Sequence, residues 1–170
     1  GVVINNLYAG IYLAWDIGAS ATENYTGWDA TNQLGYVYAT NSNYYGICAV
    51  SPANASSYRA VNNPSEVWGN QFTDARKYQF FVDGFLVTDG TSPSDWSQQI
   101  GVGPFSLQPE ATQTVAFALL GGVNLNDLKA NAQAAREVYL PVAVDETPTP
   151  ERFELAQNVP NPFHTSDNRQ

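Results

Sequence analysis

The chain has 170 residues, 44% of them hydrophobic and 14% charged, with 16 acidic residues against seven Lys and Arg and a net charge of −9. This balance argues against a nucleic-acid partner and against adsorption to an anionic membrane, because both need a basic surface. No apolar run approaches the roughly 18 residues of a membrane-spanning helix, so we expect no membrane insertion. A single cysteine, Cys48, excludes an internal disulfide and any multi-cysteine metal centre.

The first third of the chain predicts three strands. Residues 18–33 are polar and Gly-rich and are predicted to form a long loop. Short strands are predicted at residues 34–40 and 44–50, joined by a hairpin loop at residues 41–43, where Asn tolerates left-handed backbone. The strand that precedes them is predicted at residues 8–17, because apolar side chains alternate there: Ala9, Ile11, Leu13, Trp15 and Ile17.

The middle of the chain predicts little regular structure. Residues 51–70 are expected to be mostly loop, with an edge strand at residues 58–61. A short helix is predicted at residues 72–81, with Thr73 or Asp74 as its N-cap.

A hairpin is predicted next. Strands at residues 100–107 and 112–120 flank the turn Gln-Pro-Glu-Ala at residues 108–111, where Pro109 presets the turn.

The strongest helix signal runs from Leu125 to Leu140. Asn124 is the expected N-cap, and Asp127 completes a variant of the capping box. Pro141 is expected to end the helix. Its apolar stripe is Leu125, Leu128, Ala132, Ala135 and Val138 or Tyr139.

Together these elements predict a mainly β fold. We expect an antiparallel β-sandwich with the C-terminal α-helix packed on it, formed by residues 1–144. An extended Pro-rich tail follows, because residues 145–152 read Asp-Glu-Thr-Pro-Thr-Pro-Glu-Arg and are predicted to be a linker.

The tail carries the most specific motif of the chain. Residues 155–163 read Leu-Ala-Gln-Asn-Val-Pro-Asn-Pro-Phe, which resembles the opening of the Por-type sorting domain of type IX secretion system substrates in Bacteroidetes. The resemblance implies export by that machinery and an extracellular or cell-surface location. The family continues for several more strands, so residues 153–170 are expected to be a truncated start of a sorting domain. The fixed positions of the motif are Leu155, Gln157, Asn158, Pro160, Asn161, Pro162 and Phe163.

The body of the chain carries a broader resemblance. Residues 101–110, 115–122 and 127–139 resemble a β-rich accessory module that precedes the sorting tail in large secreted proteins of the same bacteria. Some of those proteins are subtilisin-like peptidases. The resemblance implies a non-catalytic module, and it leaves open that the parent protein is a secreted hydrolase or peptidase.

Chemistry-bearing residues are sparse. The only histidine, His164, lies in the tail, so a Ser–His–Asp or Cys–His centre is not expected. Cys48 is expected to be a buried, inert thiol. The spacing of the carboxylates singles out no glycosidase pair, and we predict that the chain is not an enzyme. The carboxylates weighed are Asp16, Asp29, Asp83, Asp89 and Asp95.

One loop could hold a cation. Residues 89–95 read Asp-Gly-Thr-Ser-Pro-Ser-Asp and offer carboxylate, hydroxyl and carbonyl oxygens. Asp89 and Asp95 are therefore candidate ligands of a structural calcium, although the loop lacks EF-hand spacing. The competing interpretation is an Asx-type turn. No other cofactor is expected.

Aromatic residues raise carbohydrate binding as an alternative. Trp28 and Trp68 fall in polar segments and are the candidate glycan contacts, whereas Trp15 fits the buried stripe and Trp96 could go either way. Loop tryptophans also serve to pin loops to a core.

The preferred function is a non-catalytic C-terminal module of a secreted or cell-surface bacterial protein, exported by the type IX system. It would act as a spacer, stabiliser or assembly unit. Its expected partners are the secretion machinery, neighbouring domains of the same polypeptide, and further copies of itself. One alternative is a subunit of an extracellular filament or large assembly, and another is a carbohydrate-binding module of a secreted hydrolase.

Overall fold

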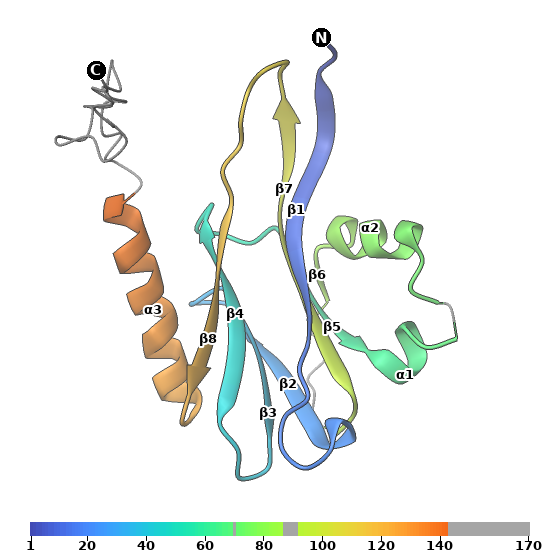
Figure 1. Cartoon of the computed structure of the whole chain (residues 1–170), viewed down its shortest axis with the longest axis vertical. Helices are drawn as coiled ribbons and strands as arrows, with labels where there is room; N and C mark the ends of the chain where they lie inside the picture. The colour runs from blue at the N-terminus through green and yellow to red at the C-terminus, as the bar shows by residue number, and fades with distance from the viewer. Residues whose placement is uncertain (70, 87–91, 143–170) are drawn as a thin grey trace, which may run out of the picture.

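Two β-sheets face each other, and helices lie on the outer face of each (Figure 1). This computed structural model describes residues 1–69, 71–86 and 92–142. The fold confirms the predicted mainly β sandwich with a C-terminal helix. The predicted linker and the sorting motif lie outside the described residues.

Sheet A has the strand order β1-β7-β5-β6. Its pairs are antiparallel except for β5 and β6, which are parallel. Helices α1 (Asn63–Glu66) and α2 (Asp74–Val82) pack against this sheet. The strands are β1 (Ile4–Ala14), β5 (Ser57–Asn62), β6 (Phe85–Leu86) and β7 (Trp96–Leu107).

Sheet B has the order β2-β3-β4-β8, with every pair antiparallel. A short 3-10 helix, η1 (Ala21–Glu23), leads into it, and α3 (Leu125–Val142) covers its outer face. The strands are β2 (Asn24–Asp29), β3 (Leu34–Ala39), β4 (Tyr44–Ser51) and β8 (Ala116–Gly122).

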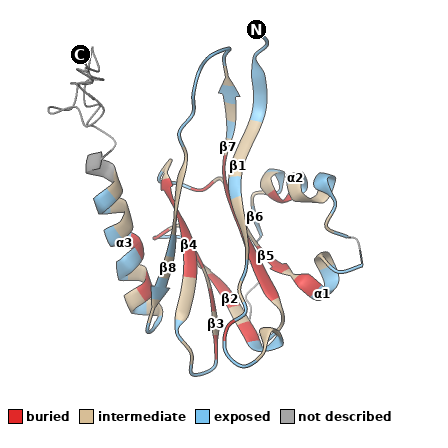
Figure 2. Ribbon diagram, in the orientation of Figure 1, coloured by how far each residue is buried: buried red, intermediate tan, exposed pale blue. Residues whose placement is uncertain are grey.

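Buried residues gather on the central strands of the two sheets (Figure 2). The main core between the sheets includes Ile47, Ala60, Ile100 and Val102. A second cluster lies between sheet B and α3, where Leu128 and Ala132 pack on strand residues that include Cys48. The buried Cys48 thiol is as predicted, and burial raises its pKa.

A polar cluster joins the two sheets inside the core. The Tyr58 hydroxyl of β5 donates to the Gly27 carbonyl of β2 at 3.1 Å and accepts from the Gln98 amide of β7 at 3.0 Å. Its oxygen also lies 3.2 Å from the Thr26 hydroxyl. Burial raises the pKa of Tyr58 far above its ordinary value, and hydrogen bonds from Thr26 and Gln98 only partly oppose this. The neutral phenol is therefore the form that the folded state holds.

The ring of Tyr58 is enclosed as tightly as its hydroxyl. The indole of Trp28 stacks on it, with the ring centroids 4.6 Å apart. On β3, the backbone of Gly35 lies directly against the ring, so that any Cβ there would collide with it. Gly35 is therefore fixed by close packing across the sandwich.

The prediction of a long loop at residues 18–33 is wrong, because β2 lies within it. Its inward face carries Asn24 and Thr26, which read as loop residues in the sequence. Both are buried and hydrogen-bonded: Asn24 donates to the Trp15 and Ala21 carbonyls, and Thr26 donates to the Tyr36 carbonyl. Tertiary contacts thus override the local pattern.

The predicted hairpin of residues 100–107 with 112–120 is also wrong. The two strands belong to different sheets: β7 lies between β1 and β5 in sheet A, and β8 lies next to β4 in sheet B. The turn itself is confirmed: Ala111 N–H donates to the Gln108 carbonyl at 3.1 Å, and Glu110 has a φ of 64° after Pro109. The chain uses this turn to cross from sheet A to sheet B.

Other boundaries shift less. The strand predicted at residues 58–61 exists, but β5 lies between β7 and β6 and not at an edge. The strand predicted at residues 8–17 starts and ends earlier, as β1. The hairpin of β3 and β4 is confirmed, with Asn41 at a φ of 58°.

Both predicted helices form. Thr73 caps α2, since its hydroxyl accepts from the Arg76 N–H, and Asn124 caps α3 by accepting from the Asp127 N–H at 3.0 Å. Helix α3 continues two residues beyond its predicted end at Leu140. Of the two candidates for the end of the apolar stripe, Tyr139 packs on the sheet and Val138 is exposed.

The buried hydroxyl of Tyr58 predicts a specific loss on Tyr58→Phe. The Gln98 amide and the Gly27 carbonyl would lose a partner inside the core, which costs about 1–3 kcal/mol of unfolding free energy. Urea unfolding at pH 7 measures it. The control is Tyr78→Phe on α2, where the side chain is half exposed and the change should stay within about 0.5 kcal/mol.

Alkaline titration gives a second readout of the same residue. Because the folded pKa of Tyr58 is raised, its contribution to stability is complete below the unfolded pKa of about 10 and is lost as the pH rises above it. Tyr58→Phe should therefore lose less stability than the wild type above pH 10. Equal stability of Tyr58→Phe and wild type at pH 7 would contradict the buried hydrogen bonds.

Candidate functional site along the first strand

The two tryptophans predicted as glycan contacts do not form one platform. Trp28 lies in β2 and not in a loop; its ring packs on Tyr58 and lies 5.3 Å from the ring of Phe85. Trp68 stands in the turn after α1 and is 54% exposed. The structure thus places one ring at the core and the other at the surface of a different element.

The predicted calcium ligands are only partly described. Asp89 lies outside the described residues. Asp95 accepts a hydrogen bond from the Asn63 amide at 2.7 Å, and its carbonyl accepts from the Asn63 N–H at 2.9 Å. Asp95 therefore tethers the start of α1 to the start of β7. Within residues 1–69, 71–86 and 92–142, no three His, Cys, Asp or Glu side chains converge on one point.

The residues of the sorting motif, with His164, also lie outside the described residues. They are Leu155, Gln157, Asn158, Pro160, Asn161, Pro162 and Phe163.

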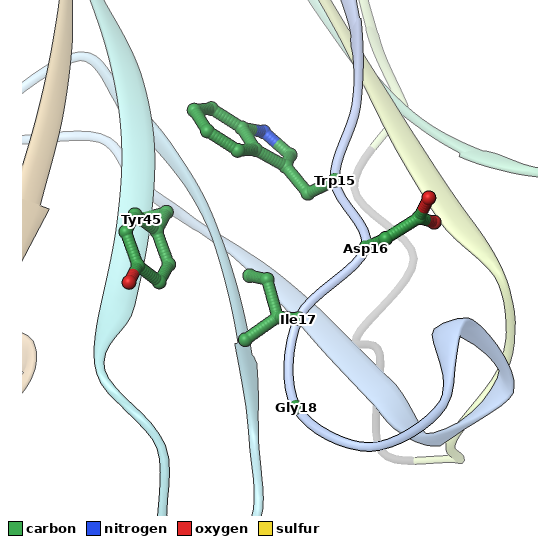
Figure 3. A pocket seen from close by; sticks show the side chains of 5 residues that line it. All are labelled: Trp15, Asp16, Ile17, Gly18 and Tyr45. Atoms are coloured by element: carbon green, nitrogen blue, oxygen red, sulfur yellow. The ribbon is translucent and has the colours of Figure 1, made fainter.

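A hollow of about 210 Å³ opens where β1 ends (Figure 3). Trp15 and Tyr45 form its walls, with stacked rings 5.8 Å apart and inclined at 28°. The indole of Trp15 is held in place because its N–H donates to the Gln98 side-chain oxygen at 3.1 Å. Ile17 faces the same space, whereas the carboxylate of Asp16 points away from it (Figure 3). The hollow therefore combines an aromatic wall with polar surface.

A second hollow, of about 240 Å³, lies between β1 and α2. Gly10 and Tyr12 of β1 line it from below, and Phe72, Lys77 and Phe81 line it from the helix side. The phenol of Tyr12 packs on Phe72, with centroids 4.7 Å apart, and donates to the Asn63 side-chain oxygen. Both hollows thus lie along β1.

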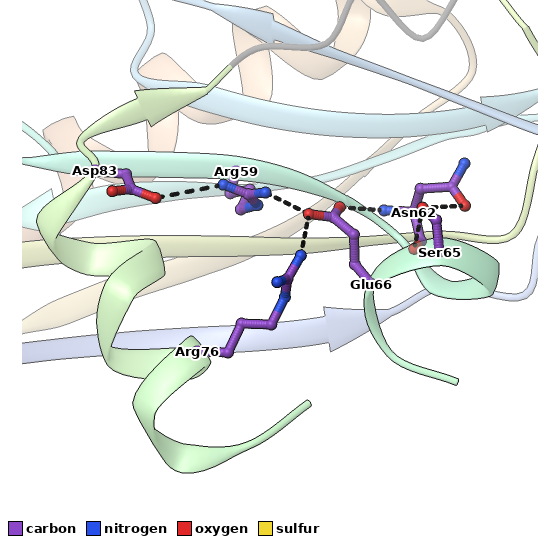
Figure 4. Close-up of polar contacts among 6 residues, drawn as sticks. All are labelled: Arg59, Asn62, Ser65, Glu66, Arg76 and Asp83. Carbon is purple, nitrogen blue, oxygen red and sulfur yellow. Dashed lines mark hydrogen bonds and ion pairs between the residues drawn. The ribbon is translucent and has the colours of Figure 1, made fainter. Parts of the chain in front are cut away.

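Charged groups outside these hollows mainly hold the fold together. Arg59 of β5 pairs with Glu66 of α1 and lies 3.7 Å from the carboxylate of Asp83 (Figure 4). Glu66 also pairs with Arg76 of α2 at 3.3 Å, and the Arg59 guanidinium lies 4.2 Å from the ring centre of Phe80. The network fastens α1 and α2 to the outer face of sheet A.

Asp29 has a comparable role on the other sheet. Its carboxylate lies 2.6 Å from the Lys129 amine of α3 and accepts two hydrogen bonds from Asn32. Burial alone would raise the pKa of Asp29, but the bonds from Lys129 and Asn32 outweigh it and hold the pKa below its ordinary value. This carboxylate anchors α3.

Comparison with known proteins gives no independent indication of function: no family model, curated protein or solved structure matches the chain. Among the described helices, none is long and apolar enough to cross a membrane.

The β1 side of the sandwich is therefore the candidate functional site, because it combines two hollows with aromatic walls. Trp15 was visible in the sequence as part of an apolar stripe. Tyr45 and the second hollow were missed, because their partners come from strands and helices distant in the sequence.

Proposed function

We propose that this chain is a non-catalytic module of a secreted or cell-surface bacterial protein exported by the type IX secretion system, where it serves as a spacer, stabiliser or assembly unit. The observation that carries the proposal is the motif at residues 155–163, which matches every fixed position of the sorting-domain opening. The acidic, Pro-rich segment before it suits a linker between a folded body and a sorting signal.

The arrangement of the body supports a mechanical role for it. Helices fastened by ion pairs cover part of the outer face of each sheet, and a buried polar cluster locks the sheets together. The carboxylates Asp29, Asp83 and Asp95 hold neighbouring elements through Lys129, Arg59 and Asn63. A body tied together in this way is suited to keeping a fixed shape between neighbouring domains.

Carbohydrate binding remains a second candidate, and the hollow of Trp15 and Tyr45 favours it. Sugar rings pack their C–H faces on aromatic side chains, and this hollow offers two such rings at the surface. The candidate contacts thereby move from Trp28 and Trp68 to Trp15 and Tyr45.

The export proposal is tested in a bacterium that has type IX secretion. In the natural polypeptide, Pro160, Asn161 and Pro162 are replaced together by Ala, which removes the rigid turn of the motif. We expect the protein to leave the medium and cell surface and to accumulate in the periplasm, as measured by fractionation and immunoblotting.

The matched control replaces Thr165, Ser166 and Asn168 by Ala in the same tail, and it should be exported as the wild type is. Undiminished export of the motif variant would contradict the proposal.

The glycan candidate is tested by retention on immobilised polysaccharides. If Trp15 and Tyr45 form the contact, Tyr45→Ala should abolish retention, whereas Trp68→Ala should leave it intact. Failure of the wild type to bind any polysaccharide in the panel would reject this candidate and leave the export proposal untouched.

A further inference from the structure

The sandwich has two lateral sides, each formed by one end strand of each sheet. Side-chain contacts close one of these sides, and the other is open. The end strands are β1 and β6 in sheet A, and β2 and β8 in sheet B. Trp28 of β2 lies against Phe85 of β6, which closes that side. Strands β1 and β8 therefore lie on the opposite side, and among the described residues β1 pairs only with β7 and β8 only with β4.

The open side has little of the usual protection of strand edges. Proteins blunt exposed edges with short strands, charged side chains, proline or β-bulges, and of these β1 has only bulges, which precede Ala9. At the closed side, β6 has only two residues and β2 carries Asp29. At the open side, β1 has eleven residues and β8 has seven, and neither strand contains a charged residue or a proline.

The interior of the sandwich also reaches solvent at the open side. Leu119 of β8 lies opposite Ile47 of β4, which is fully buried, and yet Leu119 is 55% exposed. On β1, the residues that face the core, Ala9, Ile11 and Leu13, are only half buried. An added strand would cover these side chains and would use the outward N–H and C=O groups of β1.

We propose that this edge is a self-association surface, on which β1 pairs antiparallel with β1 of a second copy of this chain. The pairing joins two A sheets into one continuous sheet across a twofold axis. This inference rests on the assembly role in the proposed function and names the surface that would carry it. Its test is independent of the test of export.

Charge limits where a second copy can bind. The chain carries a net charge of −9, so two copies repel each other over most of their surfaces. The β1 edge is an uncharged seam on this acidic molecule, where an identical strand brings no repulsion. A twofold contact uses the same surface on both copies, so β1 alone supplies both halves of the interface.

The regular part of β1 sets the extent of the seam. From Ala9 to Ala14, β1 pairs with β7 residue for residue. Between Ile4 and Ala9 the register shifts twice, and Asn6 has a φ of 56°. Such bulges disrupt strand addition, so the seam lies within the segment from Ala9 to Ala14.

Sedimentation velocity and light scattering on the full chain test the proposal. We expect a dimer, with twice the monomer mass, to form in the micromolar range. The edge variant carries Ala14→Lys and Leu119→Lys, both at exposed positions. It places charged side chains at the end of β1 and on β8, which pairing of the two copies would take out of water, and should raise the dimer dissociation constant at least tenfold.

The matched control is Val138→Lys, a position on α3 that is 70% exposed. It should dimerise as the wild type does. A tail variant, Phe153→Ser with Leu155→Ser, tests whether the tail is the occupant instead, and we expect it to dimerise normally. Circular dichroism and a thermal melt check that each variant is folded.

A wild type that stays monomeric over the whole range would overturn the proposal. So would a dimer that survives the edge variant, since its contact would lie elsewhere. Loss of the dimer in the tail variant would assign the contact to the tail and would likewise overturn self-pairing of β1.

Discussion

The buried hydroxyl of Tyr58 is the interaction on which the rest of the fold depends. It joins β5 and β7 of one sheet to β2 of the other through Gln98, Thr26 and the Gly27 carbonyl. A polar group this deep in a core is tolerated only because it has partners there. The same requirement fixes the relative position of the sheets, since a shift of either sheet would break several of these bonds together. Gln98 extends the network to Trp15, at the end of β1.

The hydrogen-bond network of Tyr58 lies nearer to one lateral side of the sandwich than to the other. Trp28 covers the ring of Tyr58 and reaches Phe85, so the β2 and β6 side is filled with aromatic side chains. On the β1 and β8 side, the core ends in half-buried side chains, the hollow beside Trp15 and the exposed Leu119. In the proposed self-association, this open side is where the second copy binds. The helices leave that place free, because they pack on the outer faces.

The sequence predicted the elements whose signals are local. Helix α3 follows from its apolar stripe and from the cap at Asn124, and the hairpin of β3 and β4 follows from alternation and from Asn41. Strand β2 could not be predicted, because its inward Asn24 and Thr26 are satisfied by partners distant in the sequence. The pairing of β7 with β1 is equally non-local. The candidate site was missed for the same reason, since its walls come from separate segments. The resemblance at residues 155–163 could be noticed in the sequence because its residues are contiguous.

The central claim is that the Tyr58 hydrogen bonds hold the two sheets together, whereas the side formed by β1 and β8 is open to solvent. Native-state hydrogen exchange of the backbone amides, measured on the full chain at a concentration where it is monomeric, tests this most directly. We expect the amides of β5, β7 and β3 to exchange only through global unfolding. The outward amides of β1 and β8 should exchange much faster, because water reaches them. Equal protection of β1, β8 and β5 in the monomer would contradict the account, since it would mean that the chain covers this edge itself.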